Sequence, residues 1–384
     1  MSKKEVKAAV MTEFGKIETR VFPYPQVPQD GMIVKMTMAG VCGTDKHIFD
    51  GRDPGVPLPI ILGHENLGKV YEIGDEARKE LEVHGEELSP GDRVTWYPAL
   101  PCGKCWYCKW LPQNHPGALC SEGPAYGLNI SCEKSPHLFG GYAEYVYIMP
   151  GTWIFKIPKS LPDEVAVLVD IFAATGGIKK AMIPYPSVKE GFGATDVVAI
   201  QGAGPIGLAA GMTAKLCGAY QIILLGAPEK RLKLAREFEI FDHIINIEEI
   251  SDPAERIKMV KDLTPGKVGP DLVVECTGVP SAVPEGLEMV RRGGVFVEIG
   301  SFVDTGETSI SPFKHLCWKD IYLIGQYGCP PHYYDVALRF VEMAWKRGWP
   351  LDKIVTHRFP IDEAQLALQA ARSLEGMKIV VVPE

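Results

Sequence analysis

The chain has 384 residues, 46% of them hydrophobic and 23% charged, and its formal net charge is −8. This length favours two domains, and the composition is that of an ordinary globular protein. The negative balance excludes the basic surface that binds nucleic acids and anionic membranes. Because the N-terminal stretch lacks a signal-peptide core and no apolar run approaches the ~20 residues of a membrane span, we expect a cytoplasmic protein with few disulfides.

The first 160 residues predict an irregular, β-rich region. Short apolar or alternating runs end in glycine or proline turns, which is typical of strands. Four such runs stand at 6–14, 31–41, 66–74 and 91–100. The pattern changes after Pro162, where residues 163–182 have helical spacing and an acidic start, as expected of one linking helix.

A strand–helix–strand unit is predicted at 195–226. There an apolar strand, a glycine turn, a small-residue helix and a second apolar strand follow one another. Later strands of the same sheet are predicted at 270–278, 293–300 and 321–327. The tail predicts two helices and a closing strand, at 333–348, 361–376 and 377–383.

The turn of this unit carries a dinucleotide-binding pattern. Gly202, Gly204 and Gly207 form G-x-G-x-x-G directly after an apolar strand, with Pro205 and Ile206 opening the helix. Glycines there permit a tight turn and the close approach of a pyrophosphate, which contacts the amides at the helix N-terminus. Such a pattern alone also occurs in plain packing turns, but the strand–turn–helix context favours dinucleotide binding.

The end of the second strand distinguishes NAD from NADP. An acidic residue there would bind the ribose 2′-hydroxyl of NAD, but this strand ends in Gly226. Gly226 leaves room for a 2′-phosphate, and Lys230 or Arg231 would neutralise it, so the sequence favours NADP over NAD. The alternative is that both cations are solvated in the first turn of the next helix, where Glu229 is an unfavourable charge.

Four of the ten cysteines are clustered, at Cys102, Cys105, Cys108 and Cys120. Such clustering in a reducing compartment indicates metal binding. An iron–sulfur run would place the fourth cysteine about three residues on and before proline, and a thioredoxin-like pair would open a helix in a βαβ setting. Neither pattern is present, and four thiolates on a looped segment predict a closed tetrahedral zinc site.

A second metal constellation is predicted in the β-rich region. Cys42 and His64 both stand in polar, glycine-framed settings. A catalytic zinc needs deprotonated Cys and neutral His ligands and one open position. These two residues supply two of three protein ligands, and the third is Asp170 or Glu65. Taken singly, such a cysteine and histidine are more often a buried thiol and a hydrogen-bonded ring.

Six motifs together resemble the zinc-dependent medium-chain alcohol dehydrogenases. In chain order they are AGVCGTDKH (39–47), LGHE (62–65), GDRV (91–94), CGKCWYC (102–108), VAIQGAGPIGL (198–208) and RRGGVFVEIG (291–300). They are spread over essentially the whole chain in the family's order. The combination of these cysteine patterns with a late glycine turn is highly specific.

The resemblance implies zinc-dependent, NAD(P)-linked oxidation of an alcohol to an aldehyde or ketone, or the reverse reaction. Cys42 and His64 would bind the catalytic zinc, with Asp170 as third ligand ahead of Glu65. Some sugar-oxidising members of the family recruit the glutamate in the place of Glu65. The zinc acts as a Lewis acid on the alcohol oxygen, and hydride passes to the nicotinamide.

The resemblance gives three residues of the first motif further roles. Asp45 would orient His64, as ligating histidines usually require. Thr44 matches the hydroxyl that hydrogen-bonds the substrate oxygen. His47 matches the ring that passes the proton to solvent.

The family also has a structural zinc lobe with this cysteine pattern, so the resemblance implies one catalytic and one structural zinc in each chain. The interval before Cys120 is longer here than is usual in the family, which leaves His115 and Cys132 as substitutes for the fourth ligand. Cys120 is favoured because all four cysteines of the pattern are present.

The implied fold is α/β with two domains. A GroES-like irregular β-barrel catalytic domain is expected at 1–167 and 326–384, with the zinc lobe at about 100–122, and a doubly wound Rossmann domain at 168–325. The family forms homodimers or homotetramers, often through Rossmann edge strands, and VFVEIG (295–300) is the expected contact strand. The partner of the site is a small-molecule alcohol or carbonyl substrate.

Three other interpretations stay open. A polyol or sugar (glucose-type) dehydrogenase of the same family uses the same chemistry on a more polar substrate. A zinc-free enone or quinone reductase shares the fold but lacks Cys42, His64 and the cysteine lobe together. The third is a catalytically inactive nucleotide-binding homologue, and the retention of Cys42, His64, Thr44 and His47 argues against it.

Overall fold

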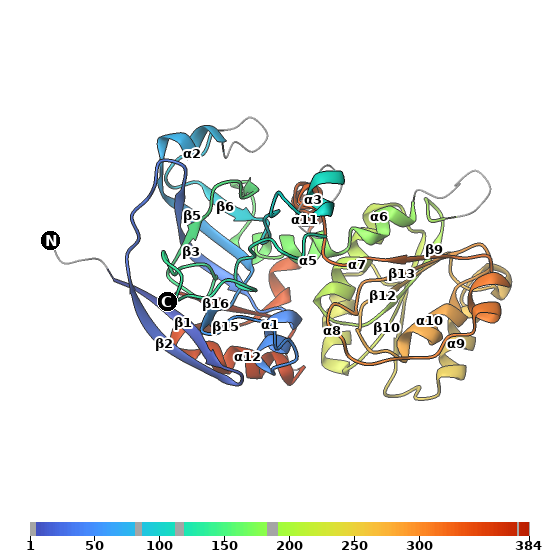
Figure 1. The fold of residues 1–384 in the computed structure, drawn as a ribbon. Coiled ribbons are helices and arrows are strands. Elements are labelled where there is room, and N and C mark those ends of the chain that lie inside the picture. The colour runs from blue at the N-terminus through green and yellow to red at the C-terminus, as the bar shows by residue number, and fades with distance from the viewer. Residues whose placement is uncertain (1–4, 81–86, 112–118, 183–190, 375, 384) are drawn as a thin grey trace. The chain divides into compact units, whose positions relative to one another are not determined.

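The chain forms two compact units (Figure 1). The computed structural model describes residues 5–80, 87–111, 119–182, 191–374 and 376–383. One unit contains Met1–Asp170, Pro330–Glu342 and Leu351–Glu384, and the other contains Ile171–Cys329 and Met343–Pro350. Most of the second unit is therefore inserted between the N-terminal and C-terminal parts of the first, and a short segment, Met343–Pro350, adds to the second unit before the chain ends in the first.

Two sheets frame the first unit. A three-stranded sheet has the order β2 (Lys16–Pro23), β1 (Glu5–Glu13), β4 (Ile60–Ile61). A larger sheet has the order β15 (Val355–Pro360), β16 (Lys378–Val382), β3 (Met32–Gly40), β5 (Glu65–Ile73), β6 (Arg93–Trp96), β8 (Ile154–Lys156), and β7 (Tyr145–Ile148) also pairs with β3. Because β15 and β16 come from the C-terminal tail, the tail completes the sheet of the N-terminal half, as the predicted GroES-like domain requires.

Short helices connect these strands. They are α1 (Gly43–Phe49), α2 (Asp75–Glu80), α3 (Trp106–Trp110), α4 (Asp163–Ala166) and α12 (Ala364–Arg372), with 3₁₀ turns at Leu351–Ile354 and Ile361–Glu363. The longer α11 (His332–Lys346) begins in this unit. None of the helices among the described residues has the length and apolar composition needed to cross a bilayer.

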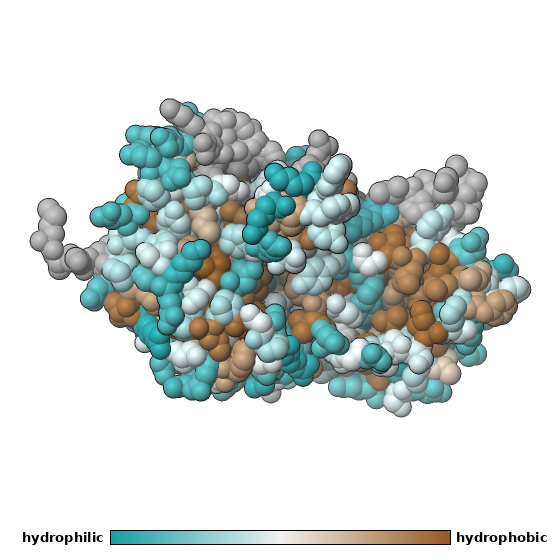
Figure 2. Space-filling view, viewed as in Figure 1, coloured by the Kyte–Doolittle hydropathy of each residue, from teal (hydrophilic) through white to brown (hydrophobic). Residues whose placement is uncertain are grey.

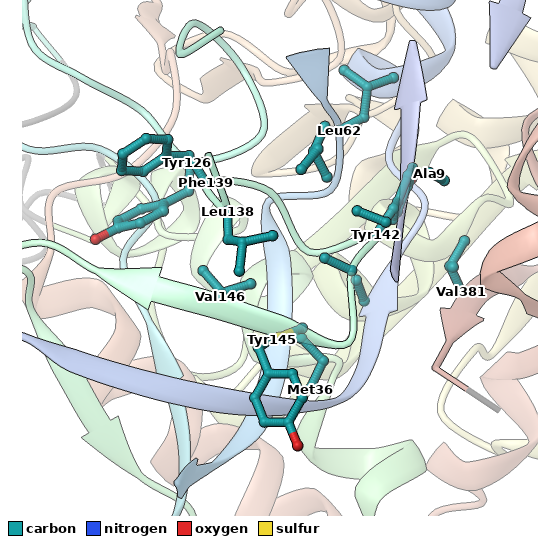
Figure 3. Packing of buried hydrophobic residues seen from close by; sticks show 14 of the residues in the cluster. Ala9, Met36, Leu62, Tyr126, Leu138, Phe139, Tyr142, Tyr145, Val146 and Val381 are labelled. Atoms are coloured by element: carbon teal, nitrogen blue, oxygen red, sulfur yellow. The ribbon is translucent and has the colours of Figure 1, made fainter. Parts of the chain in front are cut away.

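The core of the first unit collects side chains from both sheets. Ala9 of β1, Met36 of β3, Val146 of β7 and Val381 of β16 are buried together with the ring of Tyr142 (Figure 3). Burying an aliphatic or aromatic side chain of this kind contributes about 1.5–3 kcal/mol relative to leaving it exposed. This packing fixes β3, β5 and β16, the three strands that carry or flank the metal-ligand candidates.

Strand register brings distant residues together at one end of the larger sheet. Gly40, the last residue of β3, is the cross-strand partner of Glu65 on β5 and of Val380 on β16. A Cβ at Gly40 would overlap Glu65 Oε2 and lie 2.8 Å from Lys378 Cε. Glycine at this position therefore leaves the room that these two charged side chains occupy.

The second unit is a parallel sheet flanked by helices. Its strand order is β11 (His243–Asn246), β10 (Gln221–Gly226), β9 (Val197–Gln201), β12 (Leu272–Glu275), β13 (Val295–Glu298), β14 (Tyr322–Gly325). Its longer helices are α7 (Pro205–Leu216), α8 (Glu229–Glu237), α9 (Pro253–Asp262) and α10 (Ala282–Met289). A 3₁₀ turn at Pro265–Lys267 and a π-helical turn at Pro312–Cys317 complete it. The strand order reverses between β9 and β12, which confirms the predicted doubly wound Rossmann architecture.

The expectation of one linking helix at 163–182 is wrong. The structure has three short helices there, α4, α5 (Val169–Ala174) and α6 (Gly177–Ala181). The break between α5 and α6 falls at Thr175-Gly176. Thr175 Oγ1 donates to the carbonyl of Phe172 and shares a further hydrogen bond, 2.8 Å long, with Thr213 Oγ1. A side-chain bond to the backbone next to a glycine pair favours ending the helix.

The choice of VFVEIG as an edge strand is also wrong. β13 lies between β12 and β14, so β14 is the edge strand on this side of the sheet, and β11 is the edge strand on the other side. Along β14 the side chain of Leu323 is 47% exposed, and just beyond it the exposed rings of Phe302 and Tyr327 stack at 4.4 Å. Figure 2 shows hydrophobic residues gathered on the visible face of this unit. Both apolar runs predicted a strand, but only the sheet order reveals which one is at the edge.

Candidate active site and metal centres

The four clustered cysteines meet around one point. The Sγ atoms of Cys102, Cys105, Cys108 and Cys120 all lie within 4.8 Å of one another. Backbone amides point at the sulfurs: Cys102 N donates to Cys120 Sγ at 3.3 Å, and Cys105 N donates to Cys102 Sγ at 3.3 Å. Such N–H···S bonds favour thiolates over thiols. The longer interval therefore still brings Cys120 to the other three.

The pKa values of two of these thiols are shifted in opposite directions. Backbone hydrogen bonds from Lys104 and Cys105 lower the pKa of Cys102 to about 6, whereas burial raises the pKa of Cys108 to about 12. Zinc is bound by thiolates, and the charge of the metal offsets theirs. The donor set and its spacing fit a closed tetrahedral zinc site.

Of the two substitutes for Cys120, Cys132 does not join this cluster. Cys132 is buried in the hydrophobic core of the first unit, where burial raises its pKa. His115 lies outside the described residues. Among the residues that the structure describes, Cys120 is the fourth member of the group.

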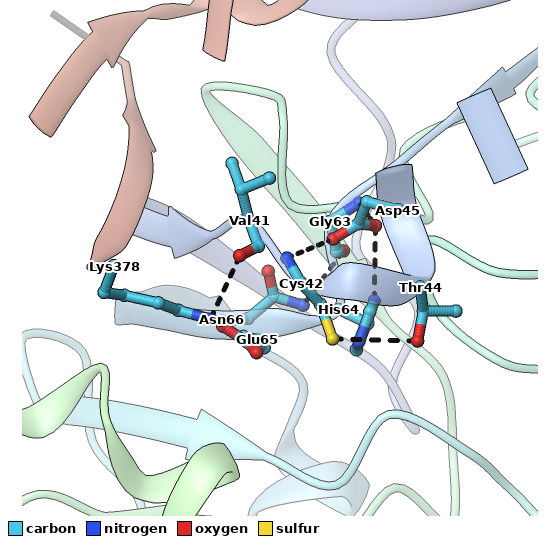
Figure 4. Close-up of polar contacts among 9 residues, drawn as sticks. All are labelled: Val41, Cys42, Thr44, Asp45, Gly63, His64, Glu65, Asn66 and Lys378. Atoms are coloured by element: carbon cyan, nitrogen blue, oxygen red, sulfur yellow. Dashed lines mark hydrogen bonds and ion pairs between the residues drawn. The ribbon is translucent and has the colours of Figure 1, made fainter. Parts of the chain in front are cut away.

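The second constellation gathers Cys42, His64 and Glu65 (Figure 4). Cys42 is the N-cap residue of α1, His64 precedes β5 and Glu65 begins it. One ligand atom from each lies within 4.8 Å of the other two. Thiolate, imidazole and carboxylate are zinc ligands, and three of them leave one position open.

Asp45 ties this site together from a fully buried position. Its Oδ2 accepts from Cys42 N at 2.8 Å, and its Oδ1 accepts from Gly63 N at 3.3 Å and lies 3.3 Å from His64 Nδ1 (Figure 4). A proton on Nδ1 facing this carboxylate leaves the Nε2 lone pair for a metal. Asp45 thus stands where the resemblance expects the residue that orients His64.

The electrostatics of the cluster favour positive charge. Burial lowers the pKa of His64, but Asp45 and Cys42 outweigh it and raise that pKa well above its usual value. A site that draws protons onto a buried histidine also draws a metal cation onto the same lone pair. The residues present therefore fit a zinc ion.

Glu65 has a partner that the sequence analysis missed. Lys378 of β16 forms an ion pair with Glu65 Oε2 and donates to the carbonyl of Val41 at 3.1 Å (Figure 4). Burial raises the pKa of Glu65, although the lysine opposes this rise. The available signal was a single cation inside the apolar strand run MKIVVVP, because a buried lysine needs a buried counter-charge.

Asp170, on α5, lies outside the three-residue group. Its Oδ1 accepts from the hydroxyl of Tyr334, on α11. The Tyr334 ring is buried, stacked on Phe155 with centroids 5.5 Å apart and in edge contact with Tyr97 at 5.5 Å. Tyr334 therefore holds Asp170 in place, a contact that joins residues 164 positions apart and that sequence patterns did not indicate.

Thr44 and His47 both belong to α1. The Cys42 thiol donates to Thr44 Oγ1 across 3.6 Å, so this hydroxyl borders the cysteine (Figure 4). His47 is partly buried, and its Nδ1 makes no hydrogen bond to the described residues. Burial, followed by the neighbouring cations Lys46 and Arg52, lowers the pKa of His47, so its ring is neutral at pH 7.

The glycine turn of the second unit connects β9 to α7. Gly202 has φ 112°, and a Cβ there would lie 3.1 Å from Thr277 Cγ2. A Cβ at Gly207 would overlap the carbonyl oxygen of Gly202. Gly204 caps α7, with Pro205 in its first turn and Ile206 next to it. The amide-rich turn at the start of a twelve-residue helix is the geometry of a pyrophosphate site.

The end of β10 packs directly on this turn. A Cβ at Gly226 would lie 2.7 Å from Ala203 N, so the position needs glycine for close packing as well as for room. Arg231, on α8, places its Nη1 atom 3.7 Å from the position that a Cβ at Gly204 would occupy. Lys230 is exposed. Of the two candidate cations, only Arg231 is placed beside the glycine turn by these contacts.

Glu229 does not face the turn as an isolated charge. Arg236 donates to Glu229 Oε1 at 2.6 Å, and this bond lowers the pKa of the glutamate. Burial lowers the pKa of Arg231, but a guanidinium stays charged at neutral pH. The first turn of α8 therefore offers a cation whose acidic neighbour is already paired.

The first unit carries a Cys–His–carboxylate group, and the second unit is a Rossmann domain with a pyrophosphate turn. These features define a zinc- and nicotinamide-dependent oxidoreductase. Family models agree: the alcohol dehydrogenase GroES-like domain matches residues 28–159, and the zinc-binding dehydrogenase domain matches residues 205–343. A 5-exo-hydroxycamphor dehydrogenase from Pseudomonas putida is 31% identical over 382 residues, which cover 98% of each chain.

Solved structures agree as well. An alcohol dehydrogenase from Thermotoga maritima has a TM-score of 0.88 and 32% identity, covering 99% of this chain and 100% of its own. A putative zinc-binding dehydrogenase from Sinorhizobium meliloti, bound to NADP, has a TM-score of 0.80 and 26% identity over 99% of this chain and 100% of its own.

The chain therefore belongs to the zinc-dependent medium-chain alcohol dehydrogenase family. It is an oxidoreductase that interconverts alcohols with aldehydes or ketones, using zinc and a nicotinamide cofactor. This confirms the family, the two-domain fold class and the reaction type that the sequence motifs predicted.

Proposed function

We propose that this chain is a cytoplasmic, NADP-preferring alcohol dehydrogenase with a catalytic and a structural zinc. The observation that carries the proposal is that Cys42, the buried His64 and the Glu65 carboxylate lie in ligand range of one another, with Asp45 behind the histidine. Cys102, Cys105, Cys108 and Cys120 would hold the structural ion. The catalytic ion would be held by Cys42, His64 and Asp170, with Glu65 as the alternative third ligand.

Zinc in this site would polarise the alcohol oxygen and lower its pKa. Thr44, whose hydroxyl borders Cys42, accepts the substrate proton. His47 takes the proton onward, because its lowered pKa keeps the ring neutral and able to accept it at pH 7. Tyr334 holds Asp170 by its hydroxyl and restricts the carboxylate to one orientation.

An initial-rate screen tests this function. Reduction of NADP is followed with primary, secondary, polyol and sugar alcohols, using the zinc-loaded enzyme. We expect turnover with at least one alcohol class, and a strong preference for polyols or sugars would move the chain to the sugar-dehydrogenase interpretation. No alcohol-dependent reduction of NADP or NAD with any class would instead support a nucleotide-binding homologue without catalysis.

Arg231 provides the test of cofactor choice. We expect Arg231→Ala to lower kcat/KM for NADP by about 10- to 100-fold, because a hydrogen-bonded charge contributes about 1.5–3 kcal/mol. The value for NAD should change little. Lys230→Ala, the exposed neighbour, is the matched control and should affect both cofactors weakly. An equal loss for both cofactors in Arg231→Ala would contradict the assignment to a 2′-phosphate.

We further propose that the enzyme is a homodimer or homotetramer. The exposed apolar edge strand β14, with Leu323 and the adjacent Phe302–Tyr327 stack, supports pairing through this edge in place of the β13 strand first expected. A strand at the edge of a sheet can extend that sheet by pairing with a strand of a second copy. Measuring the size of wild type and Leu323→Lys in solution tests this pairing, and we expect the variant to form a smaller species. An oligomer of unchanged size would contradict pairing through β14.

A further inference from the structure

Lys378 and Glu65 form the most deeply buried ion pair of the described residues for which exposures are given. Their side chains are 3% and 1% exposed, whereas the next most buried pair that involves a lysine or an arginine, Arg256–Glu285, is 11% exposed at both residues. Lys378 also donates to the carbonyl of Val41, the residue before Cys42 (Figure 4). The ammonium therefore connects β16 to the segment that carries Cys42 and to the strand that carries Glu65.

The backbone is built around this pair. Gly40 is the cross-strand partner of Glu65. Glu65 Oε2 and Lys378 Cε occupy the space that a side chain at Gly40 would need. Any larger residue at Gly40 would displace one of the two charges. A buried ion pair contributes little net stability, since desolvation offsets its attraction. The pair therefore calls for an explanation other than stability.

The location of the Lys378–Glu65 pair, next to the candidate catalytic site, supplies this explanation. A carboxylate oxygen of Glu65 lies within 4.8 Å of both Cys42 Sγ and a ring nitrogen of His64, which is within reach of a metal between them. A catalytic zinc needs one coordination position free for substrate. An unpaired Glu65 carboxylate in this low-dielectric site would bind that cation directly and fill the free position.

We propose that Lys378 is a positioning residue that holds Glu65 off the catalytic metal and so keeps the substrate's coordination position open. This inference rests on the proposed function and assigns the third protein ligand to Asp170. Lys378 balances the charge of Glu65, and Cys42 and Asp170 balance the charge of the metal.

The test uses the cobalt-substituted enzyme, whose visible absorption reports coordination, and imidazole as a probe of the open position. We expect Lys378→Met to keep both cobalt ions but to bind imidazole about 10- to 100-fold more weakly than wild type, because Glu65 takes the position. The absorption spectrum without imidazole should change as well. Unchanged imidazole affinity in a folded, cobalt-loaded Lys378→Met would overturn the proposal.

A double variant separates this role from general damage. Lys378→Met combined with Glu65→Gln removes both charges, which a buried pair usually tolerates, and we expect it to recover imidazole affinity near that of wild type. Weak imidazole binding in the double variant would show that Glu65 is not responsible. Lys156→Met, which breaks the partly exposed pair with Asp92, is the control for losing a lysine and should behave as wild type.

Glu65→Gln alone keeps the proposal testable if Lys378→Met does not fold. We expect this variant to retain the cobalt at Cys42 and to bind imidazole as wild type does, since Glu65 is not a ligand. Loss of that ion would overturn the inference, because Glu65 would then be the third ligand. Wild type that binds no metal at Cys42 would instead defeat the proposed function, so the two failures are distinguishable.

Discussion

Replacing Cys42 with serine should abolish alcohol oxidation and leave the chain folded. Serine is a favoured N-cap residue, so α1 keeps its start, but the thiolate ligand is lost. Polarisation by the metal is worth several kcal/mol in the transition state, so we expect kcat/KM to fall by about 10³-fold or more. Initial rates and metal analysis of the purified variant check this, and the zinc content should drop by one ion per chain.

Cys317→Ser is the matched control for this change. Cys317 is exposed and belongs to neither cysteine-containing cluster, so its variant should keep wild-type rates and zinc content. Circular dichroism that matches wild type would show that Cys42→Ser is folded. Near-normal turnover by folded Cys42→Ser would remove the residue from the active site and with it the proposed mechanism.

The same substitution in the cysteine lobe should have a different consequence. Cys105 caps α3 and its sulfur accepts from Cys108 N, a role that serine also fills. What Cys105→Ser loses is one of four zinc ligands, and losing a structural metal removes the folding energy it supplies. Taking this loss as similar to that of a native disulfide, about 2–5 kcal/mol, we expect thermal unfolding about 10 °C lower.

Catalysis distinguishes the two clusters. The surviving folded fraction of Cys105→Ser should keep the cobalt or zinc at Cys42, and its turnover per folded chain at low temperature should stay within a fewfold of wild type. Differential scanning calorimetry with parallel rate measurements provides both quantities. An unchanged melting temperature would mean that the lobe holds no metal that matters for folding.

Sequence patterns predicted the features that depend on residues close together in the chain. The G-x-G-x-x-G turn at Gly202–Gly207 could be predicted because its glycines lie within one short segment, between a buried strand and a helix. The cysteines of the lobe lie close in sequence, so their convergence could be expected from spacing alone. Cys42 and His64 were found from ligand chemistry and a family resemblance, and strand pairing brings them together.

Contacts between distant segments were beyond such patterns. Lys378 reaches Val41 across 337 positions, and Tyr334 reaches Asp170 across 164. Neither pairing leaves a periodic signal, since each depends on how strands or helices from distant parts of the chain pack together. The edge strand was misassigned for the same reason: strand order in a sheet is a property of tertiary packing.

Helix breaks were missed for a more local reason. Residues 163–182 have apolar spacing throughout, and that spacing alone predicts one helix. The bonds of Thr175 to Phe172 and Thr213 end α5, and the second of these depends on where α7 packs. A β-branched residue next to two glycines was the available warning.

Alcohol oxidation by this chain should depend on a metal held by Cys42 and His64. Metal analysis of the purified chain, paired with initial rates before and after dialysis against a chelator and readdition of zinc, tests it most directly. We expect two zinc ions per chain, one for each cysteine-containing ligand group, with activity lost and regained in step with the more exchangeable ion. Full activity in a chain that has lost the ion at Cys42 and His64, or that retains no zinc, would contradict this dependence.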